Sequence, residues 1–266
     1  MRFSIVTPNW NGDRFLEQTL RSVIKQRAQG LEVEYIVVDG QSTDGSAAIL
    51  ERHRKDIDLL ICEPDHGPAS AINKGLKRAT GDLVGWLNAD DFYCEGALAR
   101  AAEAMGAQPG RALCFGRCAI VDETGREIRR GITRFKEAFF RFPYRPVIQS
   151  INFISQPAMF FRRTAMEQTG PLREDLKAAW DYEFVLRLWR QGGAARIPGA
   201  PVAAFRWHAA SISGRHFAAQ FKEEYDACVA DAGRCSAPAL LHLGVRWGIV
   251  GCYALMAWRR RHAHRG

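Results

Sequence analysis

Two neighbouring carboxylates follow an apolar run in the stretch DLVGWLNADD, residues 82–91. The apolar part has the composition of a buried strand, and Asp90 and Asp91 come directly after it. Because Asn and Asp are common turn formers, a strand that reaches the surface and turns is one interpretation. Carboxylate oxygens are also the ligands that Mg²⁺ and Mn²⁺ prefer, so a metal site is the other interpretation.

The elements that must position these carboxylates alternate between strand and helix. The hydrophobic pattern predicts strands at 3–8, 33–39, 57–63 and 82–87 and helices at 13–26, 45–54 and 69–79. Repeated units of this kind build an α/β fold, Rossmann-like, in which a mostly parallel sheet has helices on both faces. Ligands of such folds bind beyond the carboxyl ends of the strands. The residues just after each predicted strand are therefore the most informative.

Polar and acidic blocks follow all four predicted strands: TPNWNG, DGQSTDGS, EPDHGP and NADD. No G-x-G-x-x-G follows the first strand and no P-loop pattern is present, which disfavours a nicotinamide dehydrogenase or an ordinary nucleoside triphosphatase. Asp44 lies in a Ser/Thr/Gly loop, where a helix cap is a better interpretation than a ligand.

The second half of the chain has a different pattern. It predicts a hairpin at 112–128 with its turn at 123–125. It also predicts helices at 95–106, 180–193 and 217–233 and strands at 154–163 and 201–208. No Ser/Gly/Pro-rich linker separates the halves, so we expect one composite domain.

The net charge of +8 is concentrated at the C-terminus, where RRRHAHRG follows the apolar residues 239–258. The uninterrupted apolar part, residues 247–258, is well short of the roughly 20 residues that span a bilayer. A helix on the membrane surface, with basic residues near lipid phosphates, is the favoured interpretation. The alternative is a helix packed on the domain with a solvated basic tail.

The seven cysteines and the N-terminus favour a cytoplasmic location. The only close cysteine pair, Cys114 and Cys118, lacks the partner pair of a zinc site, so we expect reduced thiols. The apolar run near the N-terminus is too short for a secretory signal.

Four blocks together resemble family 2 of the glycosyltransferases, the nucleotide-sugar enzymes of the GT-A fold. They are IVTPNWNG, VVDGQSTDGS, DHGPASAINKGLKRATGDLVGWLNADD and WDYEFVLRLW, and the resemblance covers about residues 2–210. It implies a GT-A catalytic domain at 1–215, with a nucleotide-sugar-binding half at 1–110 and an acceptor-binding half at 111–215. Residues 216–266 would then be a C-terminal helical segment.

The resemblance implies a divalent cation, Mn²⁺ or Mg²⁺, that stabilises the departing diphosphate. Family members carry Asp-any-Asp where this chain has NADD, so Asn88 replaces the first acid and Asp90 is the expected metal ligand. Asp91 is a helper or a supporting residue. His208 matches a position where some GT-A enzymes add a ligand, and a structural histidine is the alternative.

The resemblance also implies a donor-binding set along the same edge. Its members are Thr7, Pro8, Asn9, Asp39, Asp65, Asn73, Asn88, Ala89 and Asp90. Asp39 would read the base edge, since a carboxylate accepts a ring N–H, and a turn or cap role is the alternative. Lys74 would either approach the diphosphate or stay solvated.

On the acceptor side the resemblance implies that Asp181 is the base that takes the proton of the attacking hydroxyl in a single, inverting displacement. An acid that offsets the helix macrodipole is the alternative, and the two roles are compatible. Trp180 stands where many members carry an acid. It would stack on a sugar ring or belong to the core. Gln156 is expected to bind sugar hydroxyls, and Glu183 is a weaker candidate for the base.

We therefore predict an inverting, metal-dependent glycosyltransferase that moves a sugar from a nucleoside diphosphate to a saccharide acceptor. The C-terminus suggests a lipid-linked acceptor in surface polysaccharide assembly and a peripheral contact with the cytoplasmic face of the membrane. One alternative is a non-catalytic nucleotide-sugar-binding protein, in which Asn88 and Trp180 mark a decayed site. The other is a basic nucleic-acid-binding protein, which only the charge supports, so we expect no nucleic acid partner.

Overall fold

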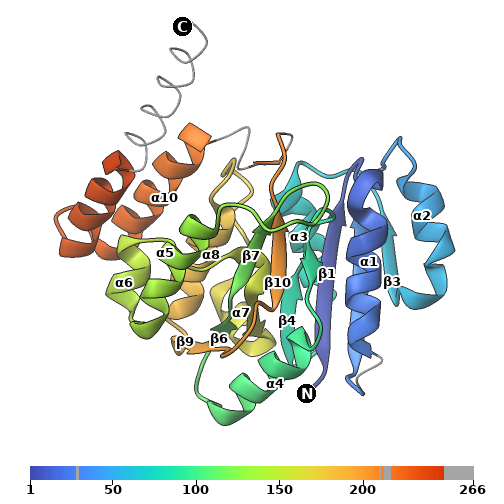
Figure 1. Ribbon diagram of the computed structural model, residues 1–266, viewed down its shortest axis with the longest axis horizontal. Helices are drawn as coiled ribbons and strands as arrows, with labels where there is room; N and C mark the ends of the chain where they lie inside the picture. Colours follow the sequence, from blue (N-terminus) through green and yellow to red (C-terminus); the bar gives the residue numbers. More distant parts are fainter. Residues whose placement is uncertain (28–29, 210, 213–216, 249–266) are drawn as a thin grey trace, which may run out of the picture.

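The structure is a computed structural model that describes residues 1–27, 30–209, 211–212 and 217–248 (Figure 1). The predicted alternation in the first half is confirmed. Its strands are β1 (Phe3–Asn9), β2 (Val33–Asp39), β3 (Leu59–Cys62) and β4 (Leu83–Trp86). Its helices are α1 (Asp13–Arg27), α2 (Ser46–Arg52), the short 3₁₀ helix η1 (Arg54–Asp56) and α3 (Pro68–Leu76).

A seven-stranded sheet in the order β3-β2-β1-β4-β8-β6-β9 forms the centre of the molecule. Strands β1 to β4 are parallel, as the sequence predicts. β8 (Met159–Arg162) runs antiparallel to both neighbours, while β6 (Leu113–Phe115) and β9 (Ala194–Arg196) are parallel to each other. The carboxyl ends of β1 and β4 thus face the same edge, as a site beyond the strands requires.

The strands are buried on both faces because alternate side chains enter two hydrophobic cores. Phe3 and Ile5 of β1 pack with α1, α2 and α4 (Ala97–Ala107), whereas Val6 packs with α3, α7 (Arg163–Thr169) and α8 (Trp180–Trp189). The period of two along an extended strand explains this division. Helices therefore cover both faces of the sheet, as expected.

A second, three-stranded sheet stands beside the carboxyl edge. It consists of β5 (Phe92–Tyr93), β10 (Ala203–Arg206) and β7 (Cys118–Val121), with β10 in the middle. The prediction of a hairpin at 112–128 is wrong about strand pairing, because β6 and β7 belong to different sheets. Its turn is confirmed: Asp122 Oδ1 accepts the N–H groups of Thr124 and Arg126, and a single bridge, Val121 to Glu127, follows.

Helices of the second half cover the far end of the sheet. They include elements that the sequence pattern did not predict: α5 (Arg130–Ala138), η2 (Phe139–Arg141), α6 (Arg145–Ser150) and η3 (Gln156–Ala158). The predicted helix α10 (Phe217–Ala232) is joined to α8, because the Glu223 carboxylate accepts the N–H groups of residues 177–179. α10 thus packs directly on the half of the domain that is predicted to bind the acceptor.

The chain is also helical at 237–248, where it packs on α6. His242 is buried and its Nδ1 donates a hydrogen bond of 2.9 Å to the Gln149 carbonyl. Within the described ranges, no helix is long and apolar enough to cross a membrane. The six cysteines of these ranges are free thiols. The basic tail and Cys252 lie outside the described residues.

Candidate functional site

The loops after β1 and β2 are joined by a buried hydrogen-bond network. Asp39 is only 5% exposed, and its carboxylate accepts from Asn9 Nδ2 at 2.7 Å and from the Ser42 backbone N–H at 2.9 Å. Asp39 therefore shapes the turn that follows β2. Asn9 Oδ1 is buried and has no hydrogen-bond partner among the described residues, so it is an acceptor that a ligand group could satisfy.

The loops after β1, β2 and β3 come together around Gly40. A Cβ atom on this glycine would lie 2.4 Å from Asp65 Oδ2 and 3.4 Å from Trp10 Cδ1. Trp10 is 69% exposed, an unusual state for a large ring. The sequence prediction missed Trp10, although an aromatic residue in a polar block directly after a strand was a usable signal. An indole and a carboxylate thus border Asp39 at this edge.

Four other residues of the predicted donor side have their side chains occupied by the protein or buried in it. Thr7 Oγ1 is 3.0 Å from Tyr35 Oη inside the sheet, and Pro8 is buried in β1. The Asn73 amide bonds both backbone groups of Leu172, and Lys74 pairs with Glu63 at 3.1 Å. The Asn73 bonds attach α3 to the loop before α8. None of the four arrangements supports a direct contact of the side chain with a donor.

The two predicted metal ligands meet at the carboxyl edge. Asp90 Oδ2 lies 3.0 Å from His208 Nε2, although 118 residues separate them in the chain. Both side chains are partly accessible, 28% for Asp90 and 13% for His208. A carboxylate oxygen and an imidazole nitrogen are both metal ligands. A divalent cation can therefore replace the proton of the hydrogen bond between them.

This pair alone does not complete a coordination sphere. Within the described ranges, no group of three or more His, Cys, Asp and Glu residues is placed to hold a metal ion. Mg²⁺ is ordinarily held by one or two protein carboxylates together with substrate phosphates and water. The residues present fit a cation of this kind that binds together with a diphosphate.

Asp91 has a different position from its neighbour. It is 1% exposed and its Oδ1 accepts the Arg206 backbone N–H at 2.8 Å. Burial, and secondly the charge of Asp90, raise the pKa of Asp91 well above its usual range. Asp91 is therefore a buried residue of the turn, whereas the partly accessible Asp90 stays the predicted metal ligand.

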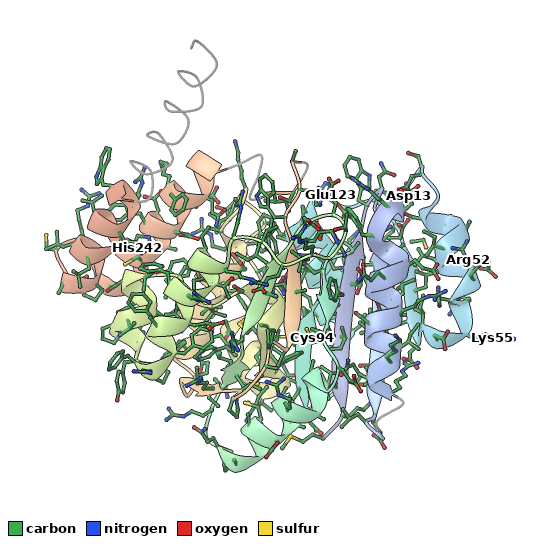
Figure 2. All side chains as sticks on the ribbon, in the orientation of Figure 1. Asp13, Arg52, Lys55, Cys94, Glu123 and His242 are labelled. Carbon is green, nitrogen blue, oxygen red and sulfur yellow. The ribbon has the colours of Figure 1, made fainter. Side chains whose placement is uncertain are left out.

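Arg206 is a buried guanidinium that the sequence prediction missed. Its side chain donates to the backbone carbonyls of Asp90, Asp122 and Glu123 and to Gln18 Oε1, at distances of 2.6 to 3.0 Å. It also lies 4.4 Å from the centre of the Phe15 ring. It thus connects the NADD turn, α1 and the turn that carries Glu123. Figure 2 shows Glu123 beside the start of α1, at Asp13.

Gln156 links the donor and acceptor sides. Its Nε2 donates to the Trp86 carbonyl at 2.7 Å, and its Oε1 accepts from Asn88 Nδ2 at 3.3 Å. The preceding residue, Ser155, accepts a hydrogen bond of 3.3 Å from Lys136 Nζ. Lys136 comes from α5, so residues of β4, η3 and α5 form one polar wall.

Asp181 lies in the first turn of α8, and its Oδ1 accepts the Tyr182 backbone N–H at 2.7 Å. Burial, followed by the negative charge of Glu224, raises the pKa of Asp181 to about 6, while Lys136 opposes this shift. A carboxylate with a pKa near the working pH suits general base catalysis. Glu183 is held by Arg187 in an ion pair of 2.8 Å, so its carboxylate is already engaged by the protein.

Glu224 is a second buried acid whose charge acts on Asp181. Trp180 stands at the position where many family members carry an acid. It is 8% exposed and packs in the core, which agrees with the interpretation of Trp180 as a core residue. Glu224 comes from α10, is 5% exposed, and accepts from Asn152 Nδ2 at 3.1 Å. Neither Glu224 nor Lys136 was predicted from the sequence, because both lie more than 40 residues from Asp181 and outside any motif.

Comparison with known proteins places this geometry in context. The family model Glycosyl transferase family 2 matches residues 4–170. The Staphylococcus aureus (strain MW2) protein TarS, a poly(ribitol-phosphate) beta-N-acetylglucosaminyltransferase, is 26% identical over 231 residues, which are 85% of this chain and 38% of TarS. The O-antigen biosynthesis protein RfbC of Myxococcus xanthus is 30% identical over 191 residues, 70% of this chain and 14% of RfbC. The chain thus spans less than half the length of either relative.

Solved structures share the fold. TarS residues 1–349 in complex with UDP-GlcNAc superpose with a TM-score of 0.68 at 20% identity, over 91% of this chain and 69% of that one. The mannosyltransferase PcManGT of Pyrobaculum calidifontis, in complex with GDP-Man and Mn²⁺, gives a TM-score of 0.63 at 19% identity, over 98% and 80% of the two chains. These likenesses confirm the expected GT-A type of fold.

Proposed function

Because the chain belongs to glycosyl transferase family 2, and is therefore a glycosyltransferase, we propose that it is an inverting, metal-dependent enzyme with a nucleoside diphosphate sugar as donor. The observation that carries this proposal is the 3.0 Å contact of Asp90 and His208 at the carboxyl edge of the sheet. The bound UDP-GlcNAc and GDP-Man of the two structural relatives support the donor class.

The residues at this edge divide the work of binding the donor. Asp90 and His208 would hold the cation, Mn²⁺ or Mg²⁺, which neutralises charge on the leaving diphosphate. Asp39, Asp65 and the exposed Trp10 would surround the base, with the free Oδ1 of Asn9 as a further acceptor. Stacking on an exposed indole suits any nucleobase, so the choice of base falls to polar groups.

Asp181 acts in the transfer itself. As the acceptor oxygen forms its bond to the anomeric carbon, the bond from that carbon to the diphosphate oxygen breaks and the acceptor proton passes to the Asp181 carboxylate. Attack from the side opposite the leaving group inverts the anomeric centre. The pKa of about 6 leaves Asp181 mostly ionised at neutral pH, yet more basic than an ordinary aspartate.

The acceptor is proposed to be a saccharide, presented on a lipid carrier during assembly of a cell-surface polysaccharide. The name of RfbC as an O-antigen biosynthesis protein supports this class. The basic C-terminal sequence supports a peripheral membrane contact from the cytoplasmic side.

Thermal unfolding with UDP, GDP, dTDP, CDP and ADP, each with Mn²⁺ and again with chelator, tests the donor site. A diphosphate at 100 times its Kd adds about 2.7 kcal/mol, or a shift of several °C for a domain of this size. We expect one diphosphate to stabilise only with metal, and Asp90→Asn to remove that effect. Stabilisation that is equal with chelator would contradict a metal site at Asp90.

A transfer assay separates the enzyme from a non-catalytic binding protein. We expect Asp181→Asn to lower transfer by at least about 100-fold, because general base catalysis contributes 10² to 10⁴. Diphosphate binding should stay unchanged in this variant. Transfer that is unaffected by Asp181→Asn would overturn the assigned role of this residue.

A further inference from the structure

Exposed apolar side chains are concentrated in two segments of the second half. In the described parts of the chain nine large apolar side chains are exposed, and seven of them lie at 132–144 or 240–247. The seven are Ile132, Phe135, Phe142, Tyr144, Leu240, Leu241 and Trp247, with exposures from 38% to 67%. Single exposed apolar residues are ordinary, whereas a concentration of this size marks an interaction surface.

The two segments lie on neighbouring elements. Helix 237–248 packs on α6 through the hydrogen bond from His242 to the Gln149 carbonyl. α6 begins at Arg145, directly after Tyr144, and Arg145 also pairs with Asp231 at 2.8 Å. Figure 1 shows α5, α6 and α10 grouped at one end of the molecule, and Figure 2 places His242 there.

The charges between these apolar side chains are almost all positive. Residues 129–145 contain five arginines and one lysine but a single acid, Glu137, which Arg117 neutralises at 2.7 Å. Arg130, Arg134 and Arg141 are exposed. Arg134 and Arg141 have no ion pair among the described residues. Exposed Phe side chains with cations between them, and no free acid, complement a surface that is anionic outside and apolar beneath.

We propose that residues 130–144, together with the exposed side of helix 237–248, form a surface that docks on an anionic lipid bilayer. Two copies of the chain that met through this face would bring its arginines against their own counterparts, so the lipid is the better complement. α5 carries both Phe135 on this surface and Lys136, whose charge acts on Asp181. Docking would therefore hold the acceptor side of the site near the membrane. This orientation rests on the proposed function, whereas lipid binding itself does not.

Flotation of the full chain with phosphatidylcholine vesicles, with and without about 30% phosphatidylglycerol, tests the surface. We expect binding to anionic vesicles that weakens as salt is raised. Arg130→Glu with Arg134→Glu should lower the partition coefficient at least tenfold, and Phe135→Ser with Phe142→Ser should do the same. The matched control is Arg52→Glu with Lys55→Glu, at the opposite end of the molecule (Figure 2), which should bind like the parent protein. Each charge-reversal variant breaks one surface ion pair, Arg130–Glu127 or Arg52–Glu17.

Three outcomes would overturn the proposal. They are no binding by the parent protein, full binding by the Arg130/Arg134 variant, or a change of oligomeric state in that variant, which would make the face a contact between copies. If deletion of 249–266 alone abolishes binding and the Arg130/Arg134 variant binds fully, the tail is the anchor instead. Stabilisation by nucleoside diphosphate and Mn²⁺, measured on the same variants, reports on the donor site separately.

Discussion

At the scale of the residue, the basicity of Asp181 depends on two side chains from other helices. Glu224 raises its pKa and Lys136 lowers it, while burial is the largest cause of the shift to about 6. Since only the ionised form accepts a proton, kcat/KM should fall as the pH drops through this value. We therefore expect the side chains around Asp181 to set the acid limit of activity.

Opposite changes of charge should move this limit in opposite directions. Glu224→Gln should lower the pKa of Asp181 and extend activity toward acid by about 0.5 to 1 pH unit. Lys136→Met should raise the pKa and shorten the active range by a similar amount. The measurement is kcat/KM from pH 5 to 8. Shifts in the same direction for both variants would show that packing, and not charge, is responsible.

The raised pKa of Asp181 also predicts a cost in stability. Its folded value of about 6 exceeds the ordinary 3.8, so the stability present at low pH is lost as the pH rises from 3.8 through 6. Asp181→Asn should therefore stabilise the fold by about 2 to 3 kcal/mol at pH 7.5, since one pKa unit corresponds to about 1.4 kcal/mol. Chemical denaturation at pH 7.5 and at pH 3.5 measures this. A gain that persists at pH 3.5 would point to a cause other than ionisation.

Motif residues of the site were predictable from sequence, and the residues that support them were not. Asp90, His208 and Asp181 match positions of the family, although Asn88 and Trp180 beside them depart from its pattern, and the structure brings Asp90 and His208 together. Arg206 acts through contacts with residues that are 83 or more positions away in the chain. Glu224 acts on Asp181 from a helix without a motif. Their roles depend on tertiary packing, which no local pattern records.

At the scale of the element, Arg206 of β10 fixes the turn that carries Asp90. We expect Arg206→Met to destabilise the fold by about 2 to 3 kcal/mol, because four partly buried acceptors lose their donor, each at about 0.5 to 1.5 kcal/mol. Arg126→Met is the matched control on the neighbouring turn, where the arginine is exposed, and its effect should stay within about 0.5 kcal/mol. Equilibrium urea unfolding compares the two. Equal losses would mean that Arg206 does not anchor the turn.

The elements of the first half were predictable because each has a single clear period. β1 and β2 are mostly apolar and almost entirely buried, and α1 carries one buried stripe. The helices between 130 and 150 have at most nine residues, and they expose aromatic side chains beside buried ones. A prediction from hydrophobic periodicity does not detect such short helices. Their exposed aromatic side chains suit an interaction surface better than a core.

At the scale of the whole molecule, the described part of the C-terminal segment combines two interpretations that the sequence kept separate. His242 is buried against α6 and Ala239 is fully buried, as in a helix packed on the domain. Leu240, Leu241 and Trp247 point away from that contact, as in a membrane-facing helix. The two are compatible because an amphipathic helix has two faces. Hydrophobicity alone could not decide between them.

The position of Glu224 has a consequence for recombining this enzyme with its relatives. A crossover near residue 215, where the catalytic pattern ends, would combine α8 of one parent with α10 of another. The chimera would keep Asp181 and every motif of the donor site, yet lose the carboxylate that faces Asp181 and the Glu223 bonds that cap the approach to α8. The unit that can be exchanged intact therefore extends at least through Ala232, the end of α10. Acceptor specificity should be transplanted with both helices together.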